Sequence, residues 1–168
     1  MEFRDDTFDS TGEFVSPNET TFFHYKDFWV LDLKSNIWEE LATSCRPPAR
    51  SGHRMVAWKN LLVVFGGFFD TYKETRYYND LWVFDTVTYT WTQIDQGEVK
   101  PANRSGFQFF VHGDTIVLYG GYCKQSIKGR KSVGVMLRDV WFLRMNSELS
   151  QIKWEKRKNT GGMGPGYS

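Results

Sequence analysis

The chain has 168 residues, a length typical of one domain, and its 21 Lys and Arg residues nearly balance its 20 Asp and Glu residues. The net charge of +1 argues against nucleic acid or an anionic membrane as the partner. No apolar run approaches the roughly 18 residues that cross a bilayer, and the first ten residues show no secretory signal. We therefore expect an intracellular protein, with the cytoplasm favoured over the nucleus.

The two cysteines, Cys45 and Cys123, lie outside any CxxC pair, and neither has a histidine at metal-ligand spacing. This pattern predicts no zinc site. Because no secretory signal is present, a reducing compartment is expected, and we predict two free thiols rather than a disulfide.

The chain contains a repeat. Arg-Ser-Gly stands at 50–52 and again at 104–106, and a diglycine follows each copy at the same distance, at 66–67 and 120–121. An acid, an apolar residue and a tryptophan then recur at 27–29, 80–82 and 139–141. A second tryptophan follows each of these triplets, at Trp38, Trp91 and Trp154. Such a fixed order at a period of about 50 residues is typical of repeat architectures.

Taken in chain order, the repeat predicts short strands. Residues 12–41 hold only the last two strands of a unit. The next unit has strands at 50–58, 61–65, 81–85 and 90–94, and the last has strands at 104–112, 115–119, 140–144 and around Trp154. The second strand of each unit is apolar without alternation, which indicates burial on both faces. No stretch shows sustained helical periodicity, so helices should be absent or very short.

Four strands with a diglycine are characteristic of one blade of a kelch β-propeller. The chain resembles the kelch-repeat family across residues 12–157. The strings HYKDFWVLDL, RSGHRMVAWK, YYNDLWVF and YGGYCKQ resemble the kelch domain-containing protein four group in particular. The resemblance implies an all-β fold, a segment of a propeller with antiparallel four-stranded blades.

A propeller has about 4–8 blades, whereas this chain supplies about two and a half. The expected segments are an unmatched, disordered N-terminus (1–11), a partial blade with third and fourth strands only (12–41), a blade (42–94), a blade with a long basic loop at 122–138 (95–157), and a Gly-rich tail or start of another blade (158–168). We expect a piece of a longer protein, whose remaining chain supplies the missing blades. Blade faces without neighbours should expose the counterparts of Trp82, Phe84 and Trp91.

The recurring residues are interpreted as structural. Glycine after the second strand permits backbone conformations closed to other residues, and an arginine fork can reach buried carbonyls or acids. The fourth-strand tryptophans offer flat faces for packing against a neighbouring blade. The residues assigned to this structural set are Gly66, Gly67, Gly120, Gly121, Arg50, Arg104, Trp38, Trp91 and Trp154.

Function on a rigid β scaffold usually lies in its loops. The loop 122–138 contains five basic residues and no acid, and the loop 68–79, expected beside it, is rich in tyrosine. The candidate partner-binding residues are Lys124, Lys128, Arg130 and Lys131 from the first loop and Tyr72, Arg76, Tyr77 and Tyr78 from the second. Arg and Tyr are enriched at binding hot spots. A run of charge of this kind is usually a solvated loop, and the alternative hypothesis is a docking site for a protein partner with an acidic segment.

No nucleophile elbow, phosphate-binding loop or HExxH motif is present, and no cofactor or metal is expected. The sequence therefore favours a non-catalytic interaction scaffold. The alternative is a fragment of a kelch-propeller enzyme, of the copper oxidase or sugar isomerase type, whose site lies in the missing blades.

Overall fold

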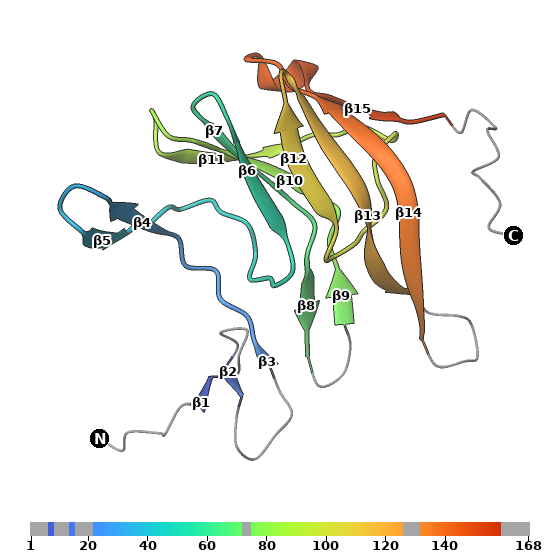
Figure 1. Cartoon of the computed structure of the whole chain (residues 1–168). Coiled ribbons are helices and arrows are strands. Elements are labelled where there is room, and N and C mark those ends of the chain that lie inside the picture. The colour runs from blue at the N-terminus through green and yellow to red at the C-terminus, as the bar shows by residue number, and fades with distance from the viewer. Residues whose placement is uncertain (1–6, 9–13, 16–21, 72–74, 126–131, 159–168) are drawn as a thin grey trace, which may run out of the picture.

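The computed structural model describes residues 7–8, 14–15, 22–71, 75–125 and 132–158, which are almost entirely β-strand (Figure 1). The strands are β1 (Thr7–Phe8), β2 (Phe14–Val15), β3 (Phe22–Phe23), β4 (Trp29–Asp32), β5 (Ile37–Glu40), β6 (Arg54–Trp58), β7 (Leu61–Phe65), β8 (Phe68–Asp70), β9 (Thr75–Tyr77), β10 (Leu81–Asp85), β11 (Thr90–Ile94), β12 (Gln108–His112), β13 (Thr115–Gln125), β14 (Val133–Arg144) and β15 (Lys153–Lys156). A 3₁₀ turn, η1 (Leu149–Gln151), is the one helical element within these residues. The all-β prediction is confirmed.

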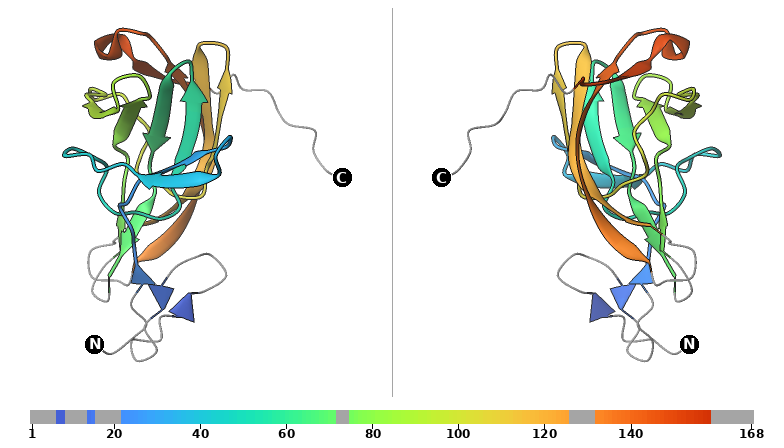
Figure 2. Two further views of the ribbon diagram at one scale, coloured as in Figure 1. Left: turned by 90° about the vertical axis from the view of Figure 1, so that its left-hand side faces the viewer. Right: turned by 90° about the vertical axis from the view of Figure 1, so that its right-hand side faces the viewer.

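Two four-stranded antiparallel sheets form the body of the molecule. The first, blade one, has the strand order β11-β10-β7-β6, and the second, blade two, has the order β12-β13-β14-β15. Figure 2 shows them standing side by side, with their second and third strands at the centre of each sheet. These are the meander sheets that the repeat predicts for a propeller segment.

The third and fourth strands keep one register in all three units. Trp38 pairs with Leu31, Trp91 pairs with Phe84, and Trp154 pairs with Leu143. In each unit the third-strand residue that pairs with this tryptophan lies two residues after the tryptophan of the Asp-apolar-Trp triplet. The three fourth-strand tryptophans are therefore structurally equivalent, as the repeat predicts.

The main core lies between blades one and two. Leu61, Val63, Phe65 and Leu81 of blade one pack in one cluster with Phe107, Ile116, Leu118, Leu143 and Trp154 of blade two. The opposite face of blade one packs on Phe28 and Leu41 from the partial blade. Both faces of blade one are thus covered, and this explains why β7 and β10 are apolar without alternation.

The units at either side of blade one expose the residues that another blade would cover. Trp29 and Trp38, the counterparts of Trp82 and Trp91, are 47% and 61% exposed. Tyr119 of blade two is 48% exposed, whereas Phe65 at the same repeat position is fully buried. This exposure agrees with the expectation for blade faces that lack neighbours.

Blade two differs from the sequence prediction. The region 122–138 was expected to be a loop, but β13 continues to Gln125 and β14 begins at Val133, so most of it is a long antiparallel hairpin. The pairing shifts register between Tyr119 and Gly121, where the diglycine forms an irregularity that redirects the strand without ending it. Alternating β-branched residues such as Val133 and Val135 then support the extension.

The N-terminal segment also differs in part from its prediction. Thr7 and Phe8 form β1, which pairs with β2, and β2 pairs with β3. A disordered end was expected for residues 1–11, and at these two residues the structure instead has a short strand. Gly12 and the Gly-rich tail 159–168 lie outside the described residues.

The turns that join third and fourth strands follow the repeat in two units. The Asp32 side chain accepts a hydrogen bond from the Lys34 amide, the Asp85 side chain accepts one from the Val87 amide, and both turns contain a residue with positive φ. In blade two, Arg144 takes the place of this aspartate, and the longer connection contains η1. Loss of the aspartate acceptor explains why the tight turn is not repeated there.

Gly66 gives a direct test of why the diglycine is required. Its φ is +68°, and a Cβ at this position would lie 2.7 Å from the Arg104 carbonyl oxygen and 2.7 Å from the Phe107 ring. Gly113 has a similar φ of +59°, but no atom lies within 4 Å of its Cβ position. We expect Gly113→Ala to lower the free energy of unfolding by about 1–2 kcal/mol through backbone strain alone. Gly66→Ala should cost clearly more, because it adds a steric clash.

Urea unfolding of the two variants measures this difference. Equal losses at Gly66 and Gly113 would show that close packing at the diglycine does not matter.

Candidate functional site

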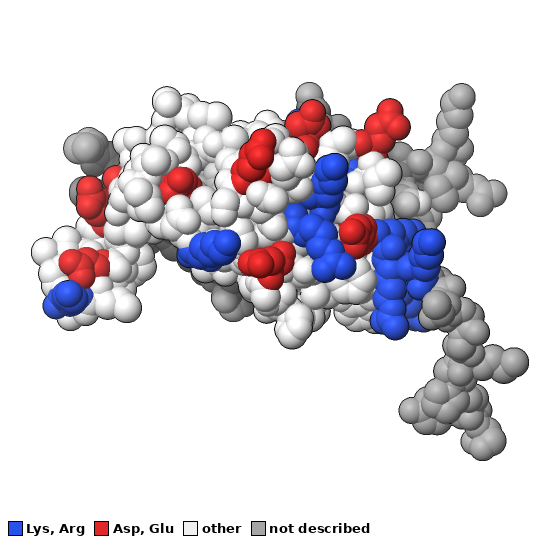
Figure 3. Space-filling model, turned by 90° about the horizontal axis from the view of Figure 1, so that it is seen from above, with Lys and Arg blue, Asp and Glu red and all other residues white. Residues whose placement is uncertain are grey.

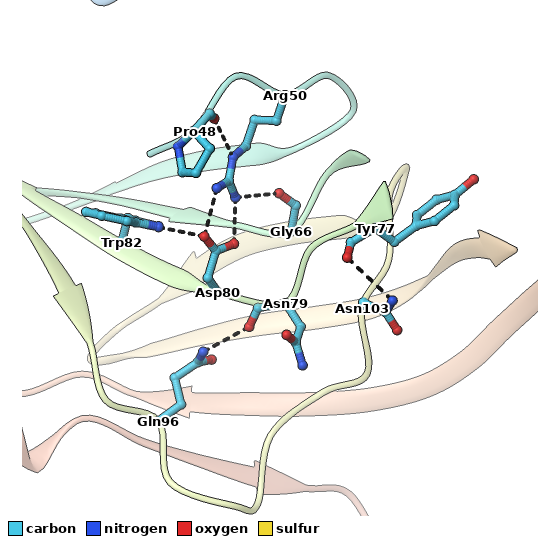
Figure 4. A network of polar contacts seen from close by, with 9 residues as sticks. All are labelled: Pro48, Arg50, Gly66, Tyr77, Asn79, Asp80, Trp82, Gln96 and Asn103. Atoms are coloured by element: carbon cyan, nitrogen blue, oxygen red, sulfur yellow. Dashed lines mark hydrogen bonds and ion pairs between the residues drawn. The ribbon is translucent and has the colours of Figure 1, made fainter. Parts of the chain in front are cut away.

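Arg50 forms the centre of a polar network inside blade one (Figure 4). Its two terminal nitrogens donate to the two carboxylate oxygens of Asp80, each at 2.7 Å. Nη1 also donates to the carbonyl oxygen of Gly66 at 3.0 Å, and Nε donates to the carbonyl oxygen of Pro48 at 3.1 Å. The Asp80 carboxylate accepts a further hydrogen bond from Trp82 Nε1 at 2.7 Å. The network therefore ties the entry to the first strand, the diglycine and the third strand together.

Blade two repeats this network. Arg104, which is fully buried, donates to the Asp139 carboxylate at 2.7 and 3.0 Å and to the carbonyl oxygen of Gly120 at 2.9 Å. Trp141 Nε1 donates to Asp139 at 2.7 Å, and Arg104 Nε donates to the Ala102 carbonyl oxygen at 2.9 Å. The prediction that these arginines reach buried acids and carbonyls is confirmed.

The arginines determine the ionisation of the two aspartates. Burial by itself would raise the pKa of Asp139, but hydrogen bonds from Arg104 and Trp141 and the positive charge of Arg104 lower that pKa to about 2. The pKa of Asp80 is likewise lowered, because Arg50 and Trp82 outweigh the effect of burial. Both carboxylates are therefore charged at neutral pH, and the two networks are structural ion pairs.

Backbone hydrogen bonds carry the network from one blade to the next. The Gly67 amide donates to the carbonyl oxygen of Arg104 at 2.8 Å, and the Arg104 amide donates to that of Tyr78 at 3.1 Å. The Tyr78 amide in turn donates to the Gly67 carbonyl oxygen at 2.9 Å. The connections after each diglycine are thus held in fixed positions, and two hairpins leave from them on one edge of the molecule.

We call this edge the hairpin rim, formed by β8 and β9 together with residues 121–125 and 133–138. Figures 1 and 2 show the two hairpins leaving the sheets in the same direction. Lys124 Nζ lies 3.5 Å from Thr75 Oγ1, and the rings of Tyr77 and Tyr122 lie 6.2 Å apart. The structure therefore brings together the two segments that the sequence placed side by side.

The predicted binding residues fall into three groups. Lys124 and Arg76 are exposed on the hairpin rim, as is Arg138. Tyr77 is half-buried, whereas Tyr78 is buried, with the Arg50 guanidinium 4.2 Å from the centre of its ring. Tyr78 is therefore part of the structural network and does not belong to a binding surface. Tyr72, Lys128, Arg130 and Lys131 lie outside the described residues.

Tyr77 keeps its phenolic proton over the whole physiological range. Burial, followed by the neighbours Tyr122, Cys123 and Asp70, raises the pKa of Tyr77 to about 12. Its hydroxyl group is therefore a hydrogen-bond donor and not a charged group at neutral pH.

Sequence reasoning missed three residues of the hairpin rim. Tyr122 packs across Gly134 of the paired strand, and Val133 and Met136 are exposed apolar side chains on β14. The signal that could have found them is the alternation of apolar and small residues over 132–135, typical of a strand, together with a tyrosine directly after the diglycine. This strand signal was outweighed by the basic residues between β13 and β14, which indicated a loop.

The opposite edge has a different charge pattern. Figure 3, which views the molecule from the end with η1, shows acidic and basic side chains interspersed over most of this face. Its larger basic groups lie toward the right-hand side of this view. Arg144 and Glu155 form an exposed ion pair at 3.1 Å on β14 and β15. Mixed charges of this kind are typical of a solvated surface.

Comparison with known proteins places this geometry in a family. A family model described as the KLHDC2/KLHL20/DRC7 Kelch-repeats domain matches residues 18–167. The chain belongs to the kelch-repeat family. Kelch domain-containing protein 3 from Homo sapiens is 31% identical over 114 residues, which cover 67% of this chain and 28% of that protein. For kelch domain-containing protein 10 from Rattus norvegicus the identity is 32% over 83 residues, 45% of this chain and 20% of that protein.

A third relative is a much longer protein. The probable inactive serine/threonine-protein kinase roco10 from Dictyostelium discoideum is 29% identical over 114 residues, 67% of this chain and 4% of that protein. The chain thus spans at most 28% of the length of these kelch relatives. Membership of the kelch domain-containing protein four group is not tested by these matches and stays a prediction.

The described residues contain no helix long and apolar enough to span a membrane. They also contain no group of three or more His, Cys, Asp or Glu side chains that could hold a metal ion. Cys45 and Cys123 are both free thiols, as predicted.

The buried arginine can be tested against an exposed one. Arg104→Ala leaves the Asp139 carboxylate without its partner, and we expect the free energy of unfolding to fall by about 3–5 kcal/mol. Arg144→Ala removes an ion pair whose side chains are both about half exposed, and the loss should stay below about 1 kcal/mol. Chemical unfolding of both variants gives the comparison. Similar losses would mean that the arginine network does not hold the blade together.

The low pKa of Asp139 predicts an acid-dependent loss of stability. A carboxyl group whose pKa is lowered on folding stabilises the native state above its unfolded pKa, and this contribution is lost as the pH falls through the folded pKa. For Asp139 the window runs from its ordinary value of 3.8 down to about 2. Urea unfolding between about pH 6 and pH 2 should therefore show a steeper decline for the wild type than for Asp139→Asn. If the free energy of unfolding fell equally with pH for the wild type and for Asp139→Asn, Asp139 would not have a lowered pKa in the folded state.

Proposed function

We propose that the chain is a non-catalytic part of a kelch propeller and that its hairpin rim binds a protein partner through an acidic segment. The observation that carries this proposal is the contact between the two hairpins, where the exposed Lys124 reaches Thr75 and the rings of Tyr77 and Tyr122 lie 6.2 Å apart. Arg76, also exposed on β9, has its guanidinium 5.3 Å from the centre of the Tyr78 ring. Guanidinium and ammonium groups form charge-assisted hydrogen bonds to carboxylates, and aromatic contacts add affinity.

The apolar groups of the hairpin rim support the same proposal. Met136 is exposed on the β14 arm opposite Tyr122, on the hairpin face that also carries Lys124, whereas Val133 is exposed on the other face of the same strand. A surface that combines apolar anchors with a basic border is typical of a protein interface, whereas a purely solvated loop has no reason to expose both. The fixed positions of the two hairpins also lower the entropy that binding would cost.

The positive charges of the hairpin rim should contribute to partner binding. Reversing two of these charges in the full-length protein tests this contribution. We expect Arg76→Glu combined with Lys124→Glu to reduce the amount of co-purifying protein partner by at least about tenfold, which corresponds to about 1.4 kcal/mol. Both side chains are exposed, so the fold should be unaffected. Quantitative mass spectrometry of the purified complexes measures the loss.

The matched control carries the same charge change elsewhere. Lys34→Glu combined with Lys153→Glu alters two exposed lysines away from the hairpin rim and should leave partner capture unchanged. Raising the salt concentration from about 0.05 to about 0.5 M should weaken capture by the wild type, because exposed charges are screened. Undiminished capture by the Arg76/Lys124 variant would show that the hairpin rim is a solvated insertion.

A further inference from the structure

The three fourth strands differ in charge at positions that the repeat makes equivalent. After its tryptophan, β5 has Glu39 and Glu40. At the same two positions, β15 has Glu155 and Lys156. β11 (Thr90–Ile94) has threonine and glutamine there and contains no charged residue. Blade one therefore ends in an uncharged strand, whereas the fourth strands of the two neighbouring units are charged.

β11 is also an edge strand. It stands at the end of the strand order β11-β10-β7-β6, and within the described residues it pairs with β10 alone. In Figure 1 it lies at the outer margin of the two blades. The exposed side chains of this strand are Thr90, Thr92 and Gln93. Threonine favours β-strands, and an edge without charge or proline presents unpaired backbone groups to another strand. The edge of β11 is thus open to pairing.

The charges determine which of these strands can pair with itself. Two copies of a strand related by a two-fold axis pair antiparallel, and both contribute the same residue at the axis. With the axis at the position after the tryptophan, β5 would place Glu39 opposite Glu39, and β15 would place Glu155 opposite Glu155. Like charges directly opposite each other destabilise a sheet, whereas a Thr–Thr pair is favourable. Of the three strands, β11, with Thr92 at this position, is the one suited to pairing with a second copy.

The segments that flank β11 match each other across such an axis. The turn before β11 contains Val87 and Tyr89, and the linker after it contains Val99. All three side chains are more than half exposed. With Thr92 opposite Thr92, the turn of each copy lies against the linker of the other. The exposed apolar side chains at the two ends of the strand then cover each other, which is favourable because it removes apolar surface from water.

A polar hollow of about 440 Å³ opens at the linker end of β11, and Gln93 and Asp95 are among its lining residues. With Thr92 at the axis, Tyr89 of one copy lies opposite Asp95 of the other. Asp95 Oδ1 accepts a hydrogen bond from the Gly97 amide at 3.0 Å, and the second carboxylate oxygen can accept another. The hollow is therefore suited to the phenolic hydroxyl group of a tyrosine from a second copy.

We propose that β11 is a self-association site, at which two copies of this chain pair their β11 strands antiparallel and join blade one of each copy into a continuous sheet. The two-fold axis passes through Thr92. The turn and the linker close the interface at both ends, and Tyr89 of each copy reaches the polar hollow of the other. The site lies outside the hairpin rim and does not depend on the function proposed for that surface.

An unrelated extended peptide is a poorer occupant of this edge. Backbone pairing would accept any strand, but β11 has only five residues, so affinity must also come from the side chains at its ends. The turn and the linker supply matching side chains when the same edge stands opposite. A second copy therefore uses the uncharged edge, the flanking apolar side chains and the polar hollow together.

Cysteine cross-linking of the 168-residue chain reads the register of this pairing. At the axis, the Cα atoms of the two copies should lie about 4.5–5.5 Å apart, a separation that a disulfide spans. In a Cys45→Ser background, which removes the exposed native thiol, Thr92→Cys should form disulfide-linked dimers under mild oxidation. Gln93→Cys should do so at least about tenfold more slowly, because Gln93 lies opposite Trp91. Non-reducing gel electrophoresis measures both rates.

The equivalent positions in the other units provide matched controls. Glu155→Cys and Glu39→Cys place a thiol at the same point of β15 and β5, and neither should cross-link faster than Gln93→Cys. Glu39→Cys also reports association through the partial blade. Arg76→Glu combined with Lys124→Glu should leave cross-linking at position 92 unchanged, which separates this site from the hairpin rim.

Moving the glutamate of the other fourth strands to β11 tests the role of charge. Thr92→Glu should raise the dissociation constant of the dimer, measured by analytical ultracentrifugation, by at least about tenfold. Ser150→Glu adds the same charge at an exposed position in η1 and should leave this constant unchanged. Thr92 is exposed, so urea unfolding should show that the fold is kept in both variants.

The proposal is overturned if Thr92→Cys cross-links no faster than Gln93→Cys and Glu155→Cys, or if Thr92→Glu leaves the dissociation constant unchanged. Faster cross-linking of Glu39→Cys would also overturn it, since the copies would then meet through the partial blade. A chain that stays monomeric overturns it as well, and an unrelated strand would then be the occupant of this edge.

Discussion

Each complete blade depends on one buried ion pair. The guanidinium of Arg50 or Arg104 comes from the segment before the first strand, and the carboxylate of Asp80 or Asp139 comes from the start of the third strand. The same guanidinium binds the carbonyl group of the first glycine, at the end of the second strand. Three segments that are distant in sequence are therefore joined by one planar group, whose rigid geometry suits this task better than the flexible ammonium of lysine.

An ion pair of this kind gives up hydration on both sides, so its value lies in specifying geometry more than in net stability. With the diglycine held in left-handed backbone conformations, the chain can turn sharply and continue outward. The outward segments are β8, β9 and the long arms of β13 and β14, which form the hairpin rim. The structural network and the proposed binding surface are thus consecutive parts of the same strands. The partial blade retains the hydrogen bond from Trp29 to Asp27, and among the described residues its sheet contains β4 and β5.

The repeat made the scaffold predictable. Residues that recur at a constant spacing must occupy equivalent positions, and this was enough to infer the blades, the arginine networks and the equivalence of Trp91 and Trp154. The continuation of β13 and β14 beyond the diglycine was not predicted, because the basic residues around 128 suggested a solvated loop. Tyr78 was assigned to the surface because residue type alone cannot show that a tyrosine packs against Arg50.

The buried arginine and aspartate act as one unit within a blade. A double-mutant cycle on Arg104 and Asp139, with Arg104→Met, Asp139→Asn and the combined variant, measures their coupling directly in the free energy of unfolding. We expect a coupling of at least about 2 kcal/mol, against less than about 1 kcal/mol for the same cycle on the exposed pair Arg144 and Glu155. Additive losses at Arg104 and Asp139, with a coupling within about 0.5 kcal/mol of zero, would contradict it.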